Sequence, residues 1–346
     1  MCSRVSQNGA SPVFAVQYHI VRKRFYIGLF LIAGILFTAS EGLPAQEDGP
    51  FSMHRARVAV PVADLRKEPI KPQPSLDHDP LEESQLLYGD LVEVLEEKEG
   101  WARVSALEQD EWSHNKRWEG YPGWIELSSL RTDPIGWKPN LVVTAKSASL
   151  RLRPEETIPA EITLSIGTRL YGRKDGTWWQ IALVDGTQGW IHSDQITSLS
   201  ILAQRDSSTI RNDLVQTARQ FLGDPYYWGG RSGFLQESQG LPPHRAVDCS
   251  GLVGLVYQAN GISIPRDAHE QWMRAKAISK KQLKPGDLIF LHHEKDPSRI
   301  THVMIYVGNG RILEGPGSGK GVWETDLATR LEEERYRRIS FGSFLS

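Results

Sequence analysis

Two stretches of this chain end in the same triplet, Gly-Trp-Ile, and this repeat constrains the fold more than any other feature. The triplet occurs at 123–125 and again at 189–191. In both stretches it follows a first strand with a Leu-Arg pair, a glycine turn before another strand, and a strand that contains tryptophan. Short alternating strands punctuated by glycine and tryptophan are typical of small β-barrels. We therefore predict two all-β domains, at 56–133 and 134–199, and expect their tryptophans to be core residues.

Downstream of the repeat, one cysteine stands at the start of a predicted helix. Cys249 is the only cysteine outside the extreme N-terminus. Apolar residues within 252–256 predict a buried helix face, Asp248 suits the N-cap, and Gly261 suits a C-terminal cap. The first turn of a helix favours negative charge, which lowers the pKa of a thiol and makes it a better nucleophile. The alternative is a buried cysteine that only fills space.

A histidine that could serve this thiol lies further along the chain. His302 stands at the start of an alternating apolar stretch, 302–307, which predicts a strand that runs into a Gly-Asn-Gly turn. The return strand of this hairpin would bring Glu314 back beside His302. Histidine can act as the general base for the thiol, and a carboxylate can orient the imidazole ring. The alternatives are a structural histidine and an exposed strand carboxylate.

Five motifs occur in one order over the last third of the chain. They span 222–230, 248–253, 264–271, 283–290 and 302–308. With these motifs the chain resembles the NlpC-type cell-wall cysteine peptidases, which have a papain-like fold. The resemblance implies an α+β catalytic domain at 205–346. Because SH3-like domains commonly accompany catalytic domains of this family, it also implies that the two β-domains are SH3-like barrels.

The resemblance also assigns roles to site residues. It implies Cys249 as the nucleophile, His302 as the base, and Tyr226 beside the thiolate as an oxyanion donor. The third polar residue of the family is most often histidine or an amide residue, whereas Glu314 stands at the matching position. The connection 231–247 is longer than is usual in the family, and we expect it to form a surface loop beside the cleft.

The N-terminal residues 1–45 are predicted to be a signal peptide. A basic run at 22–24 precedes an apolar run at 25–39 that is short for a transmembrane helix. Cleavage after Gly42 or Ala45 would release the protein to the periplasm or cell envelope, and the alternative is an uncleaved membrane anchor.

The amino-acid composition narrows the classes of partner that this protein could bind. The formal net charge of −2 over 346 residues argues against a nucleic-acid partner. We expect no cofactor and no metal, and we interpret the remaining histidines, His292 and His293 included, as solvated. The oligomeric state is left open, with a monomer as the expectation.

The catalytic domain is predicted to begin with a polar connector at 205–208. An amphipathic helix at 212–222, which ends at Gly223, is predicted to follow it.

Within the family, the chain is similar to the subgroup that cleaves peptidoglycan stem peptides after γ-D-glutamate. That subgroup requires a free N-terminal L-Ala on its substrate, and the resemblance implies that Asp248 and Ser250 help to bind it. A tyrosine of the first SH3-like domain completes this site; Tyr121 is the candidate and Tyr88 the alternative. The next residue of the substrate is diaminopimelate or lysine, which the sequence leaves open.

Three other functions remain open at this point. One is an amidase that cuts the muramoyl–L-Ala bond, and another is an acyltransferase with a related Cys-His core. The third is a cell-wall-binding module whose catalytic part has decayed. The departure at Glu314 is the feature that favours this last alternative.

Overall fold

The computed structural model describes residues 53–72, 78–233 and 246–345. These residues lie within one compact unit, Pro50–Ser346. The predicted signal peptide at 1–45 and most of the predicted loop at 231–247 lie outside the described residues. Among the residues described, no helix is long and apolar enough to cross a membrane.

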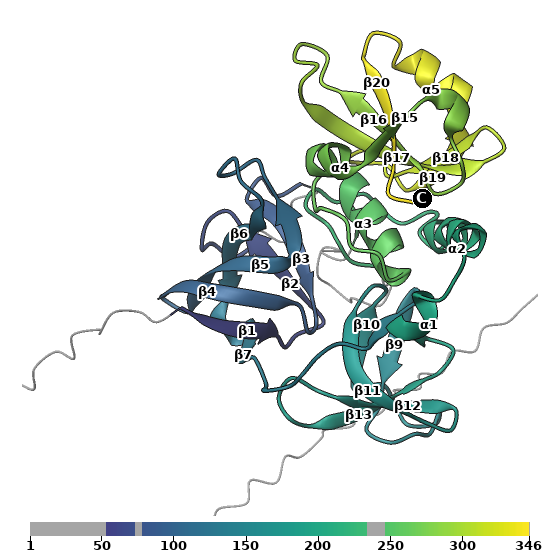
Figure 1. The fold of residues 1–346 in the computed structure, drawn as a ribbon. Helices are drawn as coiled ribbons and strands as arrows, with labels where there is room; N and C mark the ends of the chain where they lie inside the picture. The colour runs from purple at the N-terminus through teal and green to yellow at the C-terminus, as the bar shows by residue number, and fades with distance from the viewer. Residues whose placement is uncertain (1–52, 73–77, 234–245, 346) are drawn as a thin grey trace, which may run out of the picture. The chain divides into compact units, whose positions relative to one another are not determined.

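The N-terminal part of the unit is a seven-stranded antiparallel sheet with the strand order β3-β2-β6-β5-β4-β1-β7 (Figure 1). Apolar side chains from alternate strand positions form one buried cluster, as expected for strands with one covered face. The strands are β1 (His54–Val58), β2 (Val62–Arg66), β3 (Glu82–Leu87), β4 (Leu91–Lys98), β5 (Trp101–Glu111), β6 (Glu119–Glu126) and β7 (Leu130–Thr132), with the 3-10 turn η1 (Leu127–Ser129) before β7.

The middle part has a five-stranded antiparallel sheet in the order β13-β12-β11-β8-β14 and a two-stranded ribbon, β10-β9. A second hydrophobic cluster lies within it. Its elements are β8 (Leu141–Val143), β9 (Ser147–Leu150), β10 (Ile162–Ser165), β11 (Arg169–Asp175), β12 (Trp178–Ala182), β13 (Gln188–His192), β14 (Ile196–Ser198) and the short helix α1 (Leu199–Leu202).

The two Gly-Trp-Ile triplets occupy equivalent positions in these two parts. A Cβ atom on Gly123 would lie 2.6 Å from Leu65 Cγ, and one on Gly189 would lie 2.7 Å from Leu150 Cγ. The glycine therefore leaves room for the leucine of the first strand. In both parts the tryptophan of the triplet pairs through its backbone with the arginine that follows that leucine. These pairs are Arg66 with Trp124 and Arg151 with Trp190.

The tryptophans of the repeat are less buried than the sequence predicted. Trp101 and, in the second predicted domain, Trp137 are buried core residues. In contrast, Trp124, Trp178, Trp179 and Trp190 are only partly buried. A tryptophan on a small sheet covers its neighbours with one ring face and leaves the other near solvent, because such a sheet is too small to enclose so large a side chain.

The C-terminal part combines helices with a six-stranded antiparallel sheet in the order β15-β20-β16-β17-β18-β19, in agreement with the predicted α+β class. Its helices are α2 (Ser207–Arg219), α3 (Cys249–Ala259), α4 (Ala268–Arg274) and α5 (Leu327–Glu333), with the 3-10 turn η2 (Lys280–Gln282). Its strands are β15 (Lys276–Ile278), β16 (Leu288–His292), β17 (Ile300–Gly308), β18 (Arg311–Glu314), β19 (Trp323–Asp326) and β20 (Ile339–Ser343).

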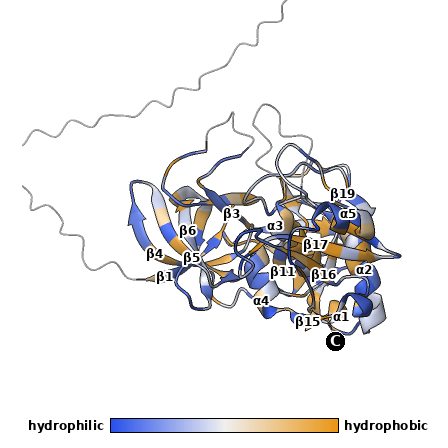
Figure 2. Cartoon of the chain, turned by 90° about the horizontal axis from the view of Figure 1, so that it is seen from above, coloured by the Kyte–Doolittle hydropathy of each residue, from blue (hydrophilic) through white to orange (hydrophobic). Residues whose placement is uncertain are grey.

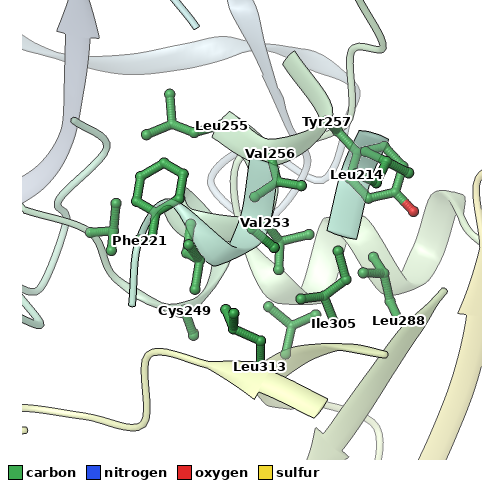
Figure 3. Close-up of a cluster of buried hydrophobic side chains, with 14 of the residues drawn as sticks. Leu214, Phe221, Cys249, Val253, Leu255, Val256, Tyr257, Leu288, Ile305 and Leu313 are labelled. Atoms are coloured by element: carbon green, nitrogen blue, oxygen red, sulfur yellow. The ribbon is translucent and has the colours of Figure 1, made fainter. Parts of the chain in front are cut away.

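Helix α3 and the central strands share the largest hydrophobic cluster of the described residues. Figure 3 shows Val253 of α3 near Ile305 of β17 and Leu313 of β18, with Cys249 at the edge of the cluster. Figure 2 shows the hydrophobic colour gathered around β16 and β17, whereas α5 is largely hydrophilic. Burial of α3 against these strands fixes the direction in which the first turn of the helix points.

Helix α2 begins earlier than the sequence predicted. The predicted helix started at 212, but the carboxylate of Asp206 accepts a hydrogen bond from Thr209 N at 2.8 Å and caps a helix that starts at Ser207. The polar residues 205–208 were interpreted as a connector, although an aspartate followed by two serines also suits a helix start. The helix ends at Arg219, and Gly223 has a positive φ of 85°.

Two buried arginines bond the C-terminal part to the first sheet. Arg266 Nε donates to Ser84 Oγ at 2.7 Å, and Arg231 Nη1 donates to Asp90 Oδ2 at 3.1 Å. Charged hydrogen bonds in buried surroundings are strongly directional, so they hold the first sheet in a defined position beside α3. This position brings residues of the first sheet to the cavity described below.

Candidate active site

The first turn of α3 is built as the sequence predicted. Asp248 is the N-cap residue, and its Oδ1 accepts a hydrogen bond from Gly251 N at 2.6 Å. Cys249 is therefore the first helical residue, with its backbone N–H at the helix start, where no intrahelical carbonyl is available. The helix ends at Ala259, and Gly261 has a positive φ of 81°.

The predicted hairpin brings His302 and Glu314 together. His302 lies on β17 and Glu314 ends β18, and the imidazole Nε2 lies 2.6 Å from Glu314 Oε2. The remaining ring nitrogen, Nδ1, is left for the thiol. Burial alone would lower the pKa of His302, but the charge of Cys249 and hydrogen bonds with Cys249 and Glu314 outweigh it and raise the pKa to about 9. The three side chains thus favour an imidazolium beside the thiol.

Glu314 is a buried carboxylate with every oxygen engaged. Its Oε1 accepts hydrogen bonds from Arg330 Nε at 2.7 Å and from Trp323 Nε1 at 3.1 Å. Burial acts to raise the pKa of Glu314, but the interactions with His302 and Arg330 prevail and lower it to about 2. The predicted exposed-strand alternative for Glu314 is wrong, because the side chain has no exposed surface.

A cavity of about 690 Å³ opens beside Cys249. Tyr226 lines it together with Cys249, and burial raises the pKa of the Tyr226 hydroxyl, with the charge of Cys249 adding to the rise. A phenol that resists ionisation next to a thiolate stays a hydrogen-bond donor. Tyr226 thus offers a hydroxyl donor on the wall of the cavity that Cys249 also lines.

Asp248 and Ser250 both lie beside the cavity, but Asp248 is already paired. Its Oδ2 accepts a hydrogen bond from Arg266 Nη2 at 2.8 Å, and its Oδ1 lies 3.2 Å from Arg266 Nη1. Ser250 Oγ also accepts from Arg266 Nη1 at 3.0 Å. Arg266 lies within the predicted motif at 264–271, but its role as the partner of Asp248 was missed. The charge of Asp248 is therefore largely balanced within the protein.

Two further carboxylates that no sequence motif singled out face the cavity. Glu83 of the first sheet and Asp267 before α4 line it with Tyr121. The Tyr121 hydroxyl lies 3.1 Å from Asp267 Oδ2 and 3.4 Å from Glu83 Oε2. A hydroxyl has one proton, so it donates to one carboxylate at a time. Burial, supported by the charges of Glu270 and Asp248 and opposed by Arg266, raises the pKa of Asp267 to about 7.

The two candidate tyrosines differ in location. Tyr121 reaches the cavity, whereas Tyr88 belongs to the hydrophobic cluster of the middle part. The hydroxyl of Tyr88 accepts a hydrogen bond from Val184 N at 2.9 Å. Geometry therefore favours Tyr121 over Tyr88 as a residue that could contact a substrate.

One histidine prediction is wrong. His292, interpreted as solvated, is fully buried at the end of β16, with Nδ1 2.5 Å from Pro297 O and Nε2 2.6 Å from Ser340 Oγ. The charged run that follows it in sequence suggested solvent, but β16 extends through this residue, which pairs with Ile300 of β17 and has the Trp272 ring against its imidazole. Within 53–72, 78–233 and 246–345, no group of three or more His, Cys, Asp or Glu side chains is arranged to hold a metal ion.

Comparison with known proteins decides the family. The NlpC/P60 family model matches residues 223–340. The gamma-D-glutamyl-L-lysine dipeptidyl-peptidase of Bacillus cereus (strain ATCC 10987 / NRS 248) is 32% identical over 261 residues, which are 73% of this chain and 73% of that protein. The chain belongs to the NlpC/P60 family. A relative of the same name from Bacillus subtilis (strain 168) is 33% identical over 254 residues, which are 73% of this chain and 78% of that protein.

The fold agrees with this assignment. The crystal structure of an NlpC/P60 family protein from Bacillus cereus ATCC 10987 matches with a TM-score of 0.70 at 26% identity, covering 84% of this chain and 100% of that chain. The five motifs therefore identified the family correctly, and the NlpC/P60 membership makes this protein a cysteine-type peptidase. The matched residues 223–340 include Tyr226, Cys249, His302 and Glu314, whereas Glu83 and Tyr121 lie outside them.

Proposed function

We propose that this NlpC/P60 enzyme hydrolyses peptidoglycan stem peptides at the bond between γ-D-glutamate and the following diamino acid. The names of its relatives support this substrate class, since two are gamma-D-glutamyl-L-lysine dipeptidyl-peptidases and another is a gamma-DL-glutamyl hydrolase. The proposal includes a requirement for a free N-terminal L-Ala. The observation that carries this requirement is the cluster of Glu83, Asp267 and Tyr121 beside Cys249.

The cluster has the chemistry of a primary-ammonium site. An ammonium group donates three hydrogen bonds and carries one positive charge. Glu83 and Asp267 offer carboxylate oxygens, and the Tyr121 oxygen keeps lone pairs while its proton is shared between them. Arg266 Nη1 donates to Asp267 Oδ1 at the long distance of 3.5 Å, and the two carboxylates otherwise share one hydroxyl proton. An ammonium would add donors and a positive charge beside them. An N-acylated peptide has no positive charge to place there.

The same cavity also carries positive charge. Lys116 and Arg299 line it, and both lie near enough to His269 to influence its titration. Stem peptides carry carboxylates on D-glutamate and on the diamino acid. The cavity thus offers partners for both signs of charge on such a peptide.

The proposed mechanism uses Cys249 as the nucleophile and His302 as the general base. The Cys249 thiolate attacks the γ-carbonyl carbon of D-glutamate, and the backbone N–H of Cys249 and the Tyr226 hydroxyl stabilise the resulting oxyanion. The C–N bond then breaks as His302 gives its Nδ1 proton to the leaving amine. Next, His302 removes a proton from water, hydroxide attacks the thioester, and the C–S bond breaks. Glu314 holds the ring throughout and carries no proton.

We interpret the two N-terminal sheets as SH3-like domains that precede a papain-like catalytic domain, with boundaries at 56–133, 134–199 and 205–346. In this proposal the first domain contributes specificity, since Glu83 and Tyr121 both come from its strands. We also propose that residues 1–45 act as a signal peptide and that the enzyme works in the periplasm or cell envelope, as a monomer.

The test is mass spectrometry of a defined peptide. L-Ala-γ-D-Glu-diaminopimelate, its lysine counterpart, their N-acetylated forms and a muramoyl-peptide are each incubated with the chain from residue 46 onward, with Cys249→Ala as the control. Release of L-Ala-D-Glu only from the free peptides, and only by the parent enzyme, supports the proposal. Equal cleavage of the N-acetylated peptides would refute the ammonium site. Cleavage only of muramoyl-peptide at L-Ala would indicate an amidase instead.

A further inference from the structure

The carboxylate that orients His302 is itself held from its other side. Glu314 Oε2 serves His302, while Oε1 accepts from Arg330 Nε at 2.7 Å. Arg330 lies on α5, and its side chain is 12% exposed. One buried negative charge therefore lies between two cations, the imidazolium of His302 and the guanidinium of Arg330. A carboxylate in that position cannot rotate without breaking a charged hydrogen bond.

Arg330 is in turn held in place by a series of alternating charges. Its Nη1 donates to Glu334 Oε1 at 2.8 Å, and Glu334 Oε2 accepts from Arg337 Nη1 at 3.2 Å. Arg337 donates to His292 O at 2.7 Å and to Thr301 Oγ1. Thr301 precedes His302 on β17. The series that begins at Glu314 thus ends one residue from the base.

We propose that Arg330 is a positioning residue of this enzyme, which keeps Glu314 ionised and directed at His302 Nε2. The inference rests on the roles of Cys249 and His302 in the proposed function, but not on the identity of the peptide. Arg330 acts through Glu314 and touches no reacting atom. If Arg330 served only to anchor α5, its loss would affect the stability of the helix and leave the titration of the thiol–imidazole pair unchanged.

Removal of the positive charge of Arg330 should move the pH–rate profile in one direction. Without Arg330, Glu314 loses a cation and takes up a proton more easily. A protonated Glu314 no longer stabilises the His302 imidazolium that is the partner of the thiolate. The acid limb of the pH–rate profile therefore moves to higher pH in Arg330→Met. The rate at neutral pH falls by about tenfold to a hundredfold, because a misplaced imidazole transfers its proton poorly.

The experiment measures alkylation of Cys249 by iodoacetamide against pH, which requires no peptide substrate. Arg330→Met should shift the acid limb upward, and Arg330→Lys, which keeps the charge, should restore it. Trp323→Phe removes a neutral donor to Glu314 and keeps the charge of Arg330, so it should move the limb less than Arg330→Met does. Arg335→Met is the matched control, since Arg335 pairs with the exposed Glu332 outside the site and should match the parent enzyme.

Each outcome decides the proposal. A folded Arg330→Met with the parent profile overturns it, and so does an equal shift in Arg335→Met, which would reflect net charge alone. If Arg330→Met does not fold by circular dichroism, Arg330→Gln takes its place, because glutamine keeps an N–H donor without the charge. A shifted limb in Arg330→Gln then supports the proposal and an unshifted one overturns it. Failure of the proposed function would appear separately, as normal alkylation without peptide cleavage.

Discussion

His302 Nε2 lies 2.6 Å from Glu314 Oε2 across the β17–β18 hairpin, which leaves Nδ1 as the ring nitrogen for Cys249. This arrangement commits one ring nitrogen to orientation and the other to proton transfer. It also places a carboxylate and a thiol around one buried imidazole. The titration of His302 should therefore depend on both partners.

The first prediction concerns Cys249→Ala. The charge of Cys249 contributes to the rise of the His302 pKa to about 9, so removal of the thiol should lower this pKa. NMR titration of the His302 ring protons measures the change, with Cys249→Ala compared with the parent protein. An unchanged His302 pKa would show that the thiol and the imidazole are not coupled.

The coupling between Cys249 and His302 also makes the stability of the protein depend on pH. The folded-state pKa of His302 lies above its ordinary value of 6.5, so the stabilisation is fully present below about 6.5 and is lost as pH rises through about 9. Cys249→Ala should weaken this pH dependence of the free energy of unfolding, since the folded-state pKa falls toward the unfolded value.

The second prediction concerns Glu314→Gln. The change leaves Arg330 and His302 without their shared buried carboxylate, which should cost about 3 kcal/mol of unfolding free energy, measured by urea denaturation. Activity should also fall, because the imidazolium loses its partner. Glu333→Gln is the control: Glu333 lies 3.5 Å from Arg330 Nη1 but is 62% exposed. The unfolding free energy of Glu333→Gln should stay within about 0.5 kcal/mol of that of the parent protein. Equal losses in Glu333→Gln and Glu314→Gln would contradict the difference between an exposed and a buried carboxylate.

The third prediction concerns Glu83→Gln. Loss of this carboxylate removes charge from the proposed ammonium site, so KM for the free peptide should rise by about tenfold or more. Cleavage of the N-acetylated peptide should change little, and the preference for the free peptide should shrink. Glu96→Gln is the control on the same sheet, since Glu96 pairs with Arg103 in an exposed position. An undiminished preference in Glu83→Gln would exclude Glu83 from substrate binding.

The fourth prediction separates two glycines of α3. A Cβ on Gly251 would lie 2.2 Å from Gly230 O, whereas a Cβ on Gly254 would meet nothing within 4 Å. Gly251→Ala should therefore destabilise the protein by about 2 kcal/mol or more, because backbone must move to make room. Gly254→Ala should stabilise it by about 0.5–1 kcal/mol, since alanine is the better helix former. Thermal unfolding of Gly251→Ala and Gly254→Ala tests this prediction. Similar melting temperatures for the two variants would contradict the close packing of Gly251 against Gly230 O.

The clash at Gly251 also explains why two of the motifs occur together. The Gly-Gly of the motif at 222–230 supplies the carbonyl that lies against Gly251, and Asp248 N donates to Gly230 O at 3.0 Å. The backbone of one motif thus packs directly on the helix start of the other. Their spacing in sequence carries no sign of this contact.

The sequence by itself determined the local parts of the site. An aspartate before an apolar helix predicts the cap, and a strand–turn–strand pattern predicts that Glu314 returns to His302, because both depend on residues near one another in the chain. The repeated Gly-Trp-Ile pattern likewise predicted two related sets of strands. The start of α2 was predicted late, since the cap at Asp206 resembles a polar connector.

Only the tertiary structure decided which charges pair. Asp248 with Arg266, Tyr121 with Asp267, and Glu314 with Arg330 join residues that are between 16 and 146 positions apart. A charged residue has the same appearance in a sequence whether it is solvated or buried with a partner, and burial depends on how sheets and helices pack. His292 shows the same limit, since its burial depends on the pairing of β16 with β17 and not on its polar neighbours in the sequence.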